Sequence, residues 1–227
     1  MAEMAASSKL HVEGPDDLNS IANLIKKYGI DFKTTPSAPQ IKFIGDVDQL
    51  LEGMETAVEV SSGRIMGFVL DADSPLADRW ASVRQRLMNC SVDNVPPVPS
   101  EDGFIGRSSR FNTRVGVWLM PDNLQDGTLE IFLQTLVGED DAIISHAESS
   151  TKTAMTLGAK FKEKDRLKAT IHAWLAWQNV PGLPYGTAIN AKYFRHNSPV
   201  AKRFVGWFVK LYNLPISFAS ETLPPEK

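Results

Sequence analysis

Two aspartates spaced by one residue, Asp71 and Asp73, directly follow a short apolar run. Residues 65–70 carry no polar side chain and predict a strand that is buried on both faces, as in a parallel sheet. Ser74 and Pro75 then predict the start of a helix, with Ser74 as its cap and Pro75 at its first position. The two aspartates should therefore lie at the carboxyl end of a central strand, where open α/β sheets bind ligands.

Asp71 and Asp73 would repel each other at such a position unless a cation or a proton neutralised part of their charge. A hard cation with oxygen ligands, Mg²⁺ first, is the natural occupant of a site made of carboxylates. The alternative is that one aspartate caps the helix and the other is solvated, because this spacing is common by chance. The pair alone does not decide between a metal site and a helix cap.

Further acids follow two other predicted strands, at residues 9–12 and 114–120. They are Glu13, Asp16 and Asp17 after the first of these strands, and Asp122, Asp126 and Glu130 after the second. Parallel strands present their carboxyl ends at one edge of a sheet, so we expect these acids to converge with Asp71 and Asp73. The competing interpretation is that such acids serve helix N-termini, which we expect of Asp16 and Asp126. Glu13 precedes the turn glycine and is not explained in this way.

A regular alternation of elements would position these acids. Up to residue 137 the order is strand, helix, strand, helix, strand, helix, insert, strand, helix, which predicts a parallel sheet with right-handed crossovers. The predicted strands cover residues 9–12, 41–44, 65–70 and 114–120; the helices cover 15–29, 47–58 and 75–88, and a fourth starts at 126; the insert at the rim covers 93–112. Further helices are predicted at 140–158, 165–178, 187–194 and 199–212.

The fold class predicted from this order is α/β, with a mainly parallel central sheet flanked by helices. We expect residues 9–137 to form the domain that carries the acids. Residues 138–220 would form a helical C-terminal portion packed on that domain, and 221–227 a frayed, proline-rich tail.

Composition limits the function further. The 227 residues suit one large domain or a domain with an appendage. A single cysteine, Cys90, excludes an internal disulfide and a cysteine-based zinc site, and we expect it to be a buried bystander. No apolar stretch is long enough to span a bilayer, and the first eight residues lack an apolar signal-peptide core. We therefore expect a cytoplasmic protein with no membrane partner.

Charge is unevenly placed along the chain. The net charge of −3 argues against bulk electrostatic binding to nucleic acid, but residues 160–210 hold ten Lys and Arg against two acids. A basic C-terminal third beside an acidic N-terminal region fits a phosphate-binding surface next to a metal site, or a solvated face of unrelated helices.

Two short motifs resemble a known domain. Val-Glu-Gly-Pro-Asp-Asp at 12–17 and Leu-Asp-Ala-Asp at 70–73 resemble the Toprim domain shared by primases, type II topoisomerases and the overcoming-lysogenization-defect (OLD-like) nucleases. The resemblance extends over roughly residues 9–137 and points to the small standalone Toprim-like proteins of unknown function that belong near the OLD-like group. Residues 168–178 and Pro181-Gly182 also resemble the helical part of those proteins. The fold that it implies is a Toprim-like Rossmannoid.

The resemblance implies a catalytic glutamate at Glu13 and metal-binding aspartates at Asp71 and Asp73. OLD-like Toprim domains add an acid four residues after the glutamate, here Asp17. They add another after the fourth strand, for which Glu130 is the first choice and Asp122 the second.

These domains also place a lysine in the later helical part. Lys168 is the best match because it lies on an amphipathic helix, with Lys162 and Lys164 as competitors. His172 lies one turn after Lys168, where a histidine is either a partly buried structural residue or a phosphate contact. An aromatic cluster further along would be core or a partner surface, or would stack on unpaired bases; it consists of Trp174, Trp177, Phe204, Trp207 and Phe208.

The function implied is Mg²⁺-dependent phosphodiester cleavage of DNA or RNA, with Mn²⁺ able to substitute, as in an effector of defence or repair. We expect Glu13, Asp71 and Asp73 to share one cation, Asp17 and Glu130 to form a second cluster, and crowding to raise carboxyl pKa values. No Gly-rich loop ending in Gly-Lys-Ser or Gly-Lys-Thr occurs, so ATP hydrolysis would require an ATPase partner protein.

Two alternatives remain open at this point. The chain could be a non-catalytic Toprim-like module that binds nucleic acid or a partner protein and keeps the acids for a structural metal. It could also be a plain scaffold whose carboxylates only cap helices.

Overall fold

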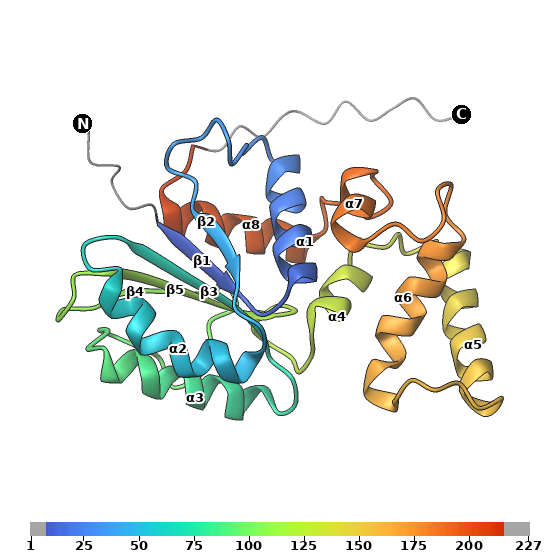
Figure 1. Cartoon of the computed structure of the whole chain (residues 1–227), viewed down its shortest axis with the longest axis horizontal. Helices are drawn as coiled ribbons and strands as arrows, with labels where there is room; N and C mark the ends of the chain where they lie inside the picture. The colour runs from blue at the N-terminus through green and yellow to red at the C-terminus, as the bar shows by residue number, and fades with distance from the viewer. Residues whose placement is uncertain (1–7, 216–227) are drawn as a thin grey trace.

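The computed structural model describes residues 8–215 and contains a central sheet with helices on both of its faces (Figure 1). The strands are β1 (Lys9–Val12), β2 (Gln40–Phe43), β3 (Ile65–Asp71), β4 (Phe104–Arg107) and β5 (Arg114–Met120). Their order in the sheet is β2-β1-β3-β5-β4. All pairs are parallel except β4 with β5. The predicted α/β fold with a mainly parallel sheet is confirmed, and β3 is its middle strand.

Eight α-helices lie in the described residues. They are α1 (Pro15–Lys27), α2 (Val47–Val60), α3 (Leu76–Asn89), α4 (Leu129–Gln134), α5 (Ala142–Thr156), α6 (Arg166–Ala176), α7 (Tyr185–Asn190) and α8 (Pro199–Tyr212). Most predicted boundaries hold within two residues. The exceptions are α4, which begins three residues after Asp126, and α7, which ends four residues before Phe194. The left-handed backbone of Lys192, with φ 66°, stops the helical path after α7.

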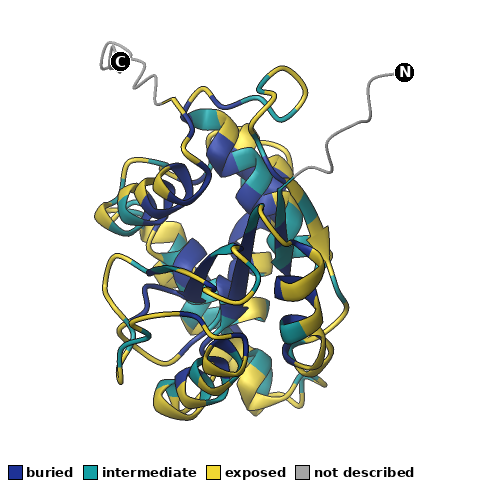
Figure 2. Ribbon diagram, turned by 90° about the vertical axis from the view of Figure 1, so that its left-hand side faces the viewer, coloured by how far each residue is buried: buried dark blue, intermediate teal, exposed yellow. Residues whose placement is uncertain are grey.

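Both faces of the sheet are covered, which explains why β3 and β5 are continuous apolar runs. Helices α2 and α3 lie against one face, and α1 and α8 lie against the other (Figure 1). Figure 2 shows the buried strands between these helices. Residues 66–70 are buried, so the prediction that residues 65–70 form a strand buried on both faces is confirmed.

Two glycines make room for α8 on the sheet. Gly67 of β3 is paired with Gly116 of β5. A Cβ atom at Gly116 would lie 2.4 Å from the Leu211 side chain, and one at Gly67 would lie 2.3 Å from the Tyr212 hydroxyl. The missing side chains therefore allow α8 to approach the two central strands closely.

The C-terminal portion joins the same hydrophobic core. Helix α6 contacts α4 and α5, and α7 contacts α1. Four members of the predicted aromatic cluster are buried in that core: Trp174, Phe204, Trp207 and Phe208. Trp177 is 46% exposed and lies against His146, with ring centroids 5.1 Å apart. The cluster is therefore core, apart from Trp177.

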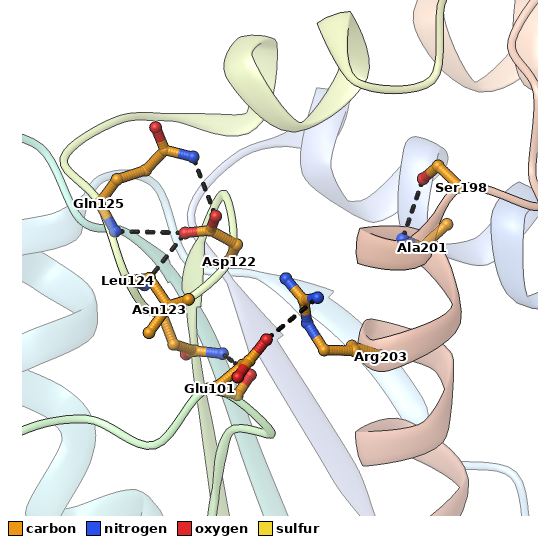
Figure 3. A network of polar contacts seen from close by, with 8 residues as sticks. All are labelled: Glu101, Asp122, Asn123, Leu124, Gln125, Ser198, Ala201 and Arg203. Carbon is orange, nitrogen blue, oxygen red and sulfur yellow. Dashed lines mark hydrogen bonds and ion pairs between the residues drawn. The ribbon is translucent and has the colours of Figure 1, made fainter.

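The insert at 93–112 forms the antiparallel edge of the sheet through β4, as a hairpin insert should. Glu101 in this insert forms an ion pair of 3.1 Å with Arg203 of α8 (Figure 3). The predicted tail at 221–227 lies outside the described residues. Between residues 8 and 215 no helix has both the length and the apolar character that crossing a membrane requires.

Candidate functional site

The sheet changes direction between β1 and β3, because the chain leaves β1 towards β2 on one side and then crosses to β3 on the other. Ligands of open α/β sheets bind at this switch point, beyond the carboxyl ends of the strands. Glu13 follows β1 there, and Asp71 ends β3. A Glu13 carboxylate oxygen accepts a hydrogen bond of 2.7 Å from the Asp71 backbone N–H. The two predicted site residues are therefore brought together.

The loops after β3 and β5 are bound to each other and fix this edge. Asp73 and Gly127 exchange two backbone hydrogen bonds of 2.9 Å. Gly127 has φ 149°, a conformation that side chains rarely adopt. The backbone N–H of Leu129, two residues after Gly127, donates a hydrogen bond of 2.9 Å to Asp71 Oδ1. The orientation of the Asp71 carboxylate thus depends on the loop that precedes α4.

The predicted start of α3 is wrong in detail. The helix begins at Leu76, Pro75 occupies the N-cap position, and Ser74 does not cap the helix. Instead the Asp126 carboxylate accepts hydrogen bonds of 2.7 Å from the Ser74 hydroxyl and the Leu76 N–H. Asp126 was expected to serve its own helix, but it caps α3 from the neighbouring loop because the two loops are held side by side.

Burial and crowding raise the pKa values of three carboxyl groups. The pKa of Asp71 rises to about 9, first because of burial and then because of the charges of Glu13, Asp17 and Glu130. Burial raises the pKa of Glu13 to about 7, and the hydrogen bond from Asp71 opposes this rise. Burial also raises the pKa of Asp17 to about 6, with Glu130 contributing. The predicted pKa rise is found for Glu13 and Asp71, but burial contributes more to it than the predicted crowding, and Asp17 lies close enough to Glu130 to be affected by its charge.

Asp73 is more exposed and has a cationic partner of its own. Its carboxylate forms an ion pair with Arg79, one turn into α3. The Asp73 backbone has φ 53°, in the left-handed region that aspartate and asparagine adopt more often than most residues. Asp73 therefore points its charge towards α3, and Arg79 competes with any other cation for it.

Lys168 is the lysine that reaches the site. Its Nζ lies 3.6 Å from Asp16 Oδ2 and 3.7 Å from Glu130 Oε1. The competitors Lys162 and Lys164 are exposed near the start of α6, and within residues 8–215 the ion pairs of Asp16 and Glu130 are made by Lys168. Asp16 was expected only to stabilise the N-terminus of α1, and it does lie in the first turn of that helix. It also forms the ion pair with Lys168.

Asp122, the second choice for the acid after the fourth strand, has a structural role instead (Figure 3). Its Oδ1 accepts hydrogen bonds from the backbone N–H groups of Leu124 and Gln125 at 3.0 and 3.2 Å. Its Oδ2 accepts from the Gln125 side chain at 2.9 Å. These bonds stabilise the turn after β5. Of the two acids considered for this position, Glu130 at the start of α4 is the one beside Lys168.

The donor chemistry of this edge fits a hard divalent cation, because carboxylate oxygens are the ligands that Mg²⁺ prefers. The arrangement differs from the one predicted. Across residues 8–215 no group of three or more His, Cys, Asp and Glu side chains is placed to hold a metal ion. The expected sharing of one cation by Glu13, Asp71 and Asp73 is therefore wrong for this conformation, in which Arg79 holds Asp73.

Cys90 and His172, which were also singled out from the sequence, both lie outside the group of carboxylates. Cys90 is buried at the end of α3, and burial raises the pKa of its thiol to about 11, which fits an unreactive bystander. His172 is exposed on α6 and stacks on Tyr185 of α7, with ring centroids 5.0 Å apart.

Sequence reasoning missed Arg79, Tyr185 and the capping of α3 by Asp126. The spacing of Arg79 from Asp73, one turn along a predicted helix, could have indicated a pair. No local signal points to the other two, because the residues they approach are 50 or more positions away.

Fold and site together define an α/β protein with a carboxylate-lined edge at the switch point of its sheet. The chain belongs to the family described as protein of unknown function DUF3226, which matches residues 7–213. Comparison with curated proteins and with solved structures gave no match. The family description names no activity, so the function has to be argued from the site.

Proposed function

We propose that this chain is a Toprim-like nuclease that cleaves phosphodiester bonds with the help of Mg²⁺, for which Mn²⁺ can substitute. One observation carries the proposal: Glu13, Asp17 and Asp71 lie partly buried together with Glu130 at the switch point, where burial and then mutual repulsion raise the pKa values of the first three. A scaffold has no need for partly buried carboxylates that repel one another, and perturbed groups of this kind concentrate at functional sites.

The roles of the residues follow from their surroundings. A divalent cation, when bound, activates water and offsets the charge of a phosphate. Glu13 Oε1 accepts a hydrogen bond from the Asp71 N–H. The second carboxylate oxygen of Glu13 would accept the proton. With a pKa of about 7, Glu13 is suited to general base catalysis near neutral pH. Lys168 would stabilise charge that develops on the phosphate.

The proposed substrate is nucleic acid, DNA or RNA. Support comes from the position of a cation, Lys168, directly beside the carboxylates. The basic residues between 160 and 210 would contact neighbouring phosphates. If the reaction is coupled to ATP hydrolysis, a partner protein supplies the ATPase, because the chain has no P-loop sequence.

A second candidate function is binding of nucleic acid or of a partner protein without catalysis. It is favoured by the ion pair between Asp73 and Arg79 and by the lack of a three-ligand group among the described residues. A catalytic site has to release Asp73 from Arg79 on binding a metal, whereas a binding module does not.

Single-turnover cleavage of supercoiled plasmid and of structured RNA in Mg²⁺ and Mn²⁺ tests the proposal. Asp71→Asn and Asp73→Asn should each abolish cleavage, because each removes an anionic ligand. Both should fold: asparagine can still accept the Leu129 N–H bond at 71, and it tolerates the left-handed backbone at 73. Lys168→Ala should lose roughly a hundredfold in rate, the usual scale for one preorganised contact.

The outcomes separate the candidates. Wild-type protein that binds either nucleic acid but cleaves neither would favour the binding module. Cleavage that survives both aspartate substitutions would contradict the assignment of the site.

A further inference from the structure

Tyr185 presents a buried hydroxyl group that has no hydrogen-bond partner in the described part of the chain. The residue begins α7 and is 1% exposed. A buried donor without a partner costs stability, and such a group in a native structure calls for an explanation. Burial raises the pKa of Tyr185, and the nearby charges of Glu130 and Asp16 add to this rise, which is consistent with a hydroxyl beside the carboxylate edge.

Two contacts hold Tyr185 in this position. Helix α7 is pressed against α1 at Gly186, where a Cβ atom would lie 2.6 Å from the Asn19 carbonyl oxygen. The His172 ring stacks on the Tyr185 ring at 5.0 Å, with an angle of 23° between the planes. His172 also lies one turn after Lys168 on α6. Tyr185 and Lys168 therefore form one wall of the site, next to Asp16 and Glu130.

This wall offers hydrogen-bond donors that the free protein does not use. Lys168 Nζ lies 3.6 and 3.7 Å from its two carboxylate partners, beyond hydrogen-bond length. The Tyr185 hydroxyl bonds to neither carboxylate, although both are strong acceptors. An ammonium group and a neutral hydroxyl on one wall match an anionic oxygen that accepts from both.

We propose that the Tyr185 hydroxyl donates a hydrogen bond to a phosphate oxygen of a ligand bound beside Lys168. The choice of phosphate as the anion rests on the proposed function. Tyr185 would then touch the substrate and orient its phosphate against the carboxylate edge. Because Asp16 and Glu130 repel an anion, phosphate should bind better when Mg²⁺ is present.

Thermal melting of the full-length protein in Mg²⁺ tests this role with two small probes. Inorganic phosphate tests a free or terminal phosphate, and a dinucleoside monophosphate tests a diester; acetate at equal ionic strength is the control anion. At least one phosphate probe should raise the melting temperature of the wild type, since a ligand that binds only the folded state stabilises it. Tyr185→Phe should weaken the apparent affinity for that probe roughly tenfold, the scale of one hydrogen bond to a charged group.

Tyr212→Phe is the matched control. The Tyr212 hydroxyl is also buried, but it donates a hydrogen bond of 2.7 Å to the Lys9 carbonyl oxygen. Without ligand, Tyr212→Phe should melt below the wild type, whereas Tyr185→Phe should melt at the same temperature or above it. With phosphate, Tyr212→Phe should keep the wild-type shift.

Three melting results would overturn the inference: no shift of the wild type with either phosphate probe, an equal shift in Tyr185→Phe, or a free Tyr185→Phe protein that melts as low as Tyr212→Phe. The last result would mean that the hydroxyl has a structural partner. A tyrosine-dependent phosphate shift in a protein that cleaves no nucleic acid would overturn the nuclease proposal and support this one. Cleavage that is unchanged in Tyr185→Phe would overturn this one alone.

Discussion

At the scale of single residues, the carboxyl groups of the edge determine how stability depends on pH. The folded pKa values of Glu13, Asp17 and Asp71 lie at about 7, 6 and 9, above their ordinary values of 4.5, 3.8 and 3.8. Below about pH 3 these groups are largely neutral in both states and change the free energy of unfolding little. As the pH rises from 4 to 9, the unfolded chain loses these protons first, so the free energy of unfolding should fall. Urea denaturation at pH 4, 7 and 9 in EDTA measures this fall.

Asp71→Asn isolates the largest of these effects. The substitution removes the charge and keeps an oxygen for the Leu129 N–H. At pH 9 the variant should be more stable than the wild type by about 1–3 kcal/mol, the usual scale for a poorly compensated buried polar group. Near pH 4 the two proteins should be close. A wild type whose stability rises steadily from pH 4 to pH 9 would show that these carboxylates are compensated in solution.

At the level of helices and strands, the packing of α8 against the sheet depends on glycines in β3 and β5. Gly116→Ala would force a methyl group against the buried Leu211 side chain, 2.4 Å away, and should cost about 1–3 kcal/mol, as overpacked cores do. Gly206→Ala is the control on α8 itself, where a Cβ atom meets nothing within 4 Å. That change should stabilise the protein by about 0.5–1 kcal/mol, because alanine is the better helix former. Urea denaturation measures both, and equal effects of the two substitutions would contradict this account of the interface.

The elements also show what the sequence can predict. The apolar runs at 65–70 and 114–120 specify buried parallel strands, and the acids that follow them come together because parallel strands end at one edge. The surroundings of those acids are set by loops and helices distant in sequence. Asp126 caps α3 across 50 positions, and Tyr185 of α7 lies within range of the charges of Asp16 and Glu130. Such contacts follow from tertiary structure and leave no periodic pattern in the chain.

At the scale of the whole molecule, the C-terminal helices complete a site that the sheet begins. Glu13 and Asp71 come from strand ends, whereas Lys168 and Tyr185 come from α6 and α7. These helices are anchored because their apolar faces join the core that α1 and α8 share with the sheet. A ligand at the edge would therefore contact both parts of the chain.

Metal titration of stability tests whether the carboxylate edge binds a divalent cation. Melting of wild type and Asp71→Asn is followed at pH 8 in EDTA and over a series of Mg²⁺ and Mn²⁺ concentrations. Both metals should raise the wild-type melting temperature, because they bind the folded state and reduce the repulsion among the acids. In Asp71→Asn the free protein should start higher, and the metal-dependent rise should be largely lost. A wild type that neither metal shifts, or an equal shift in both proteins, would contradict binding of a divalent cation at this edge.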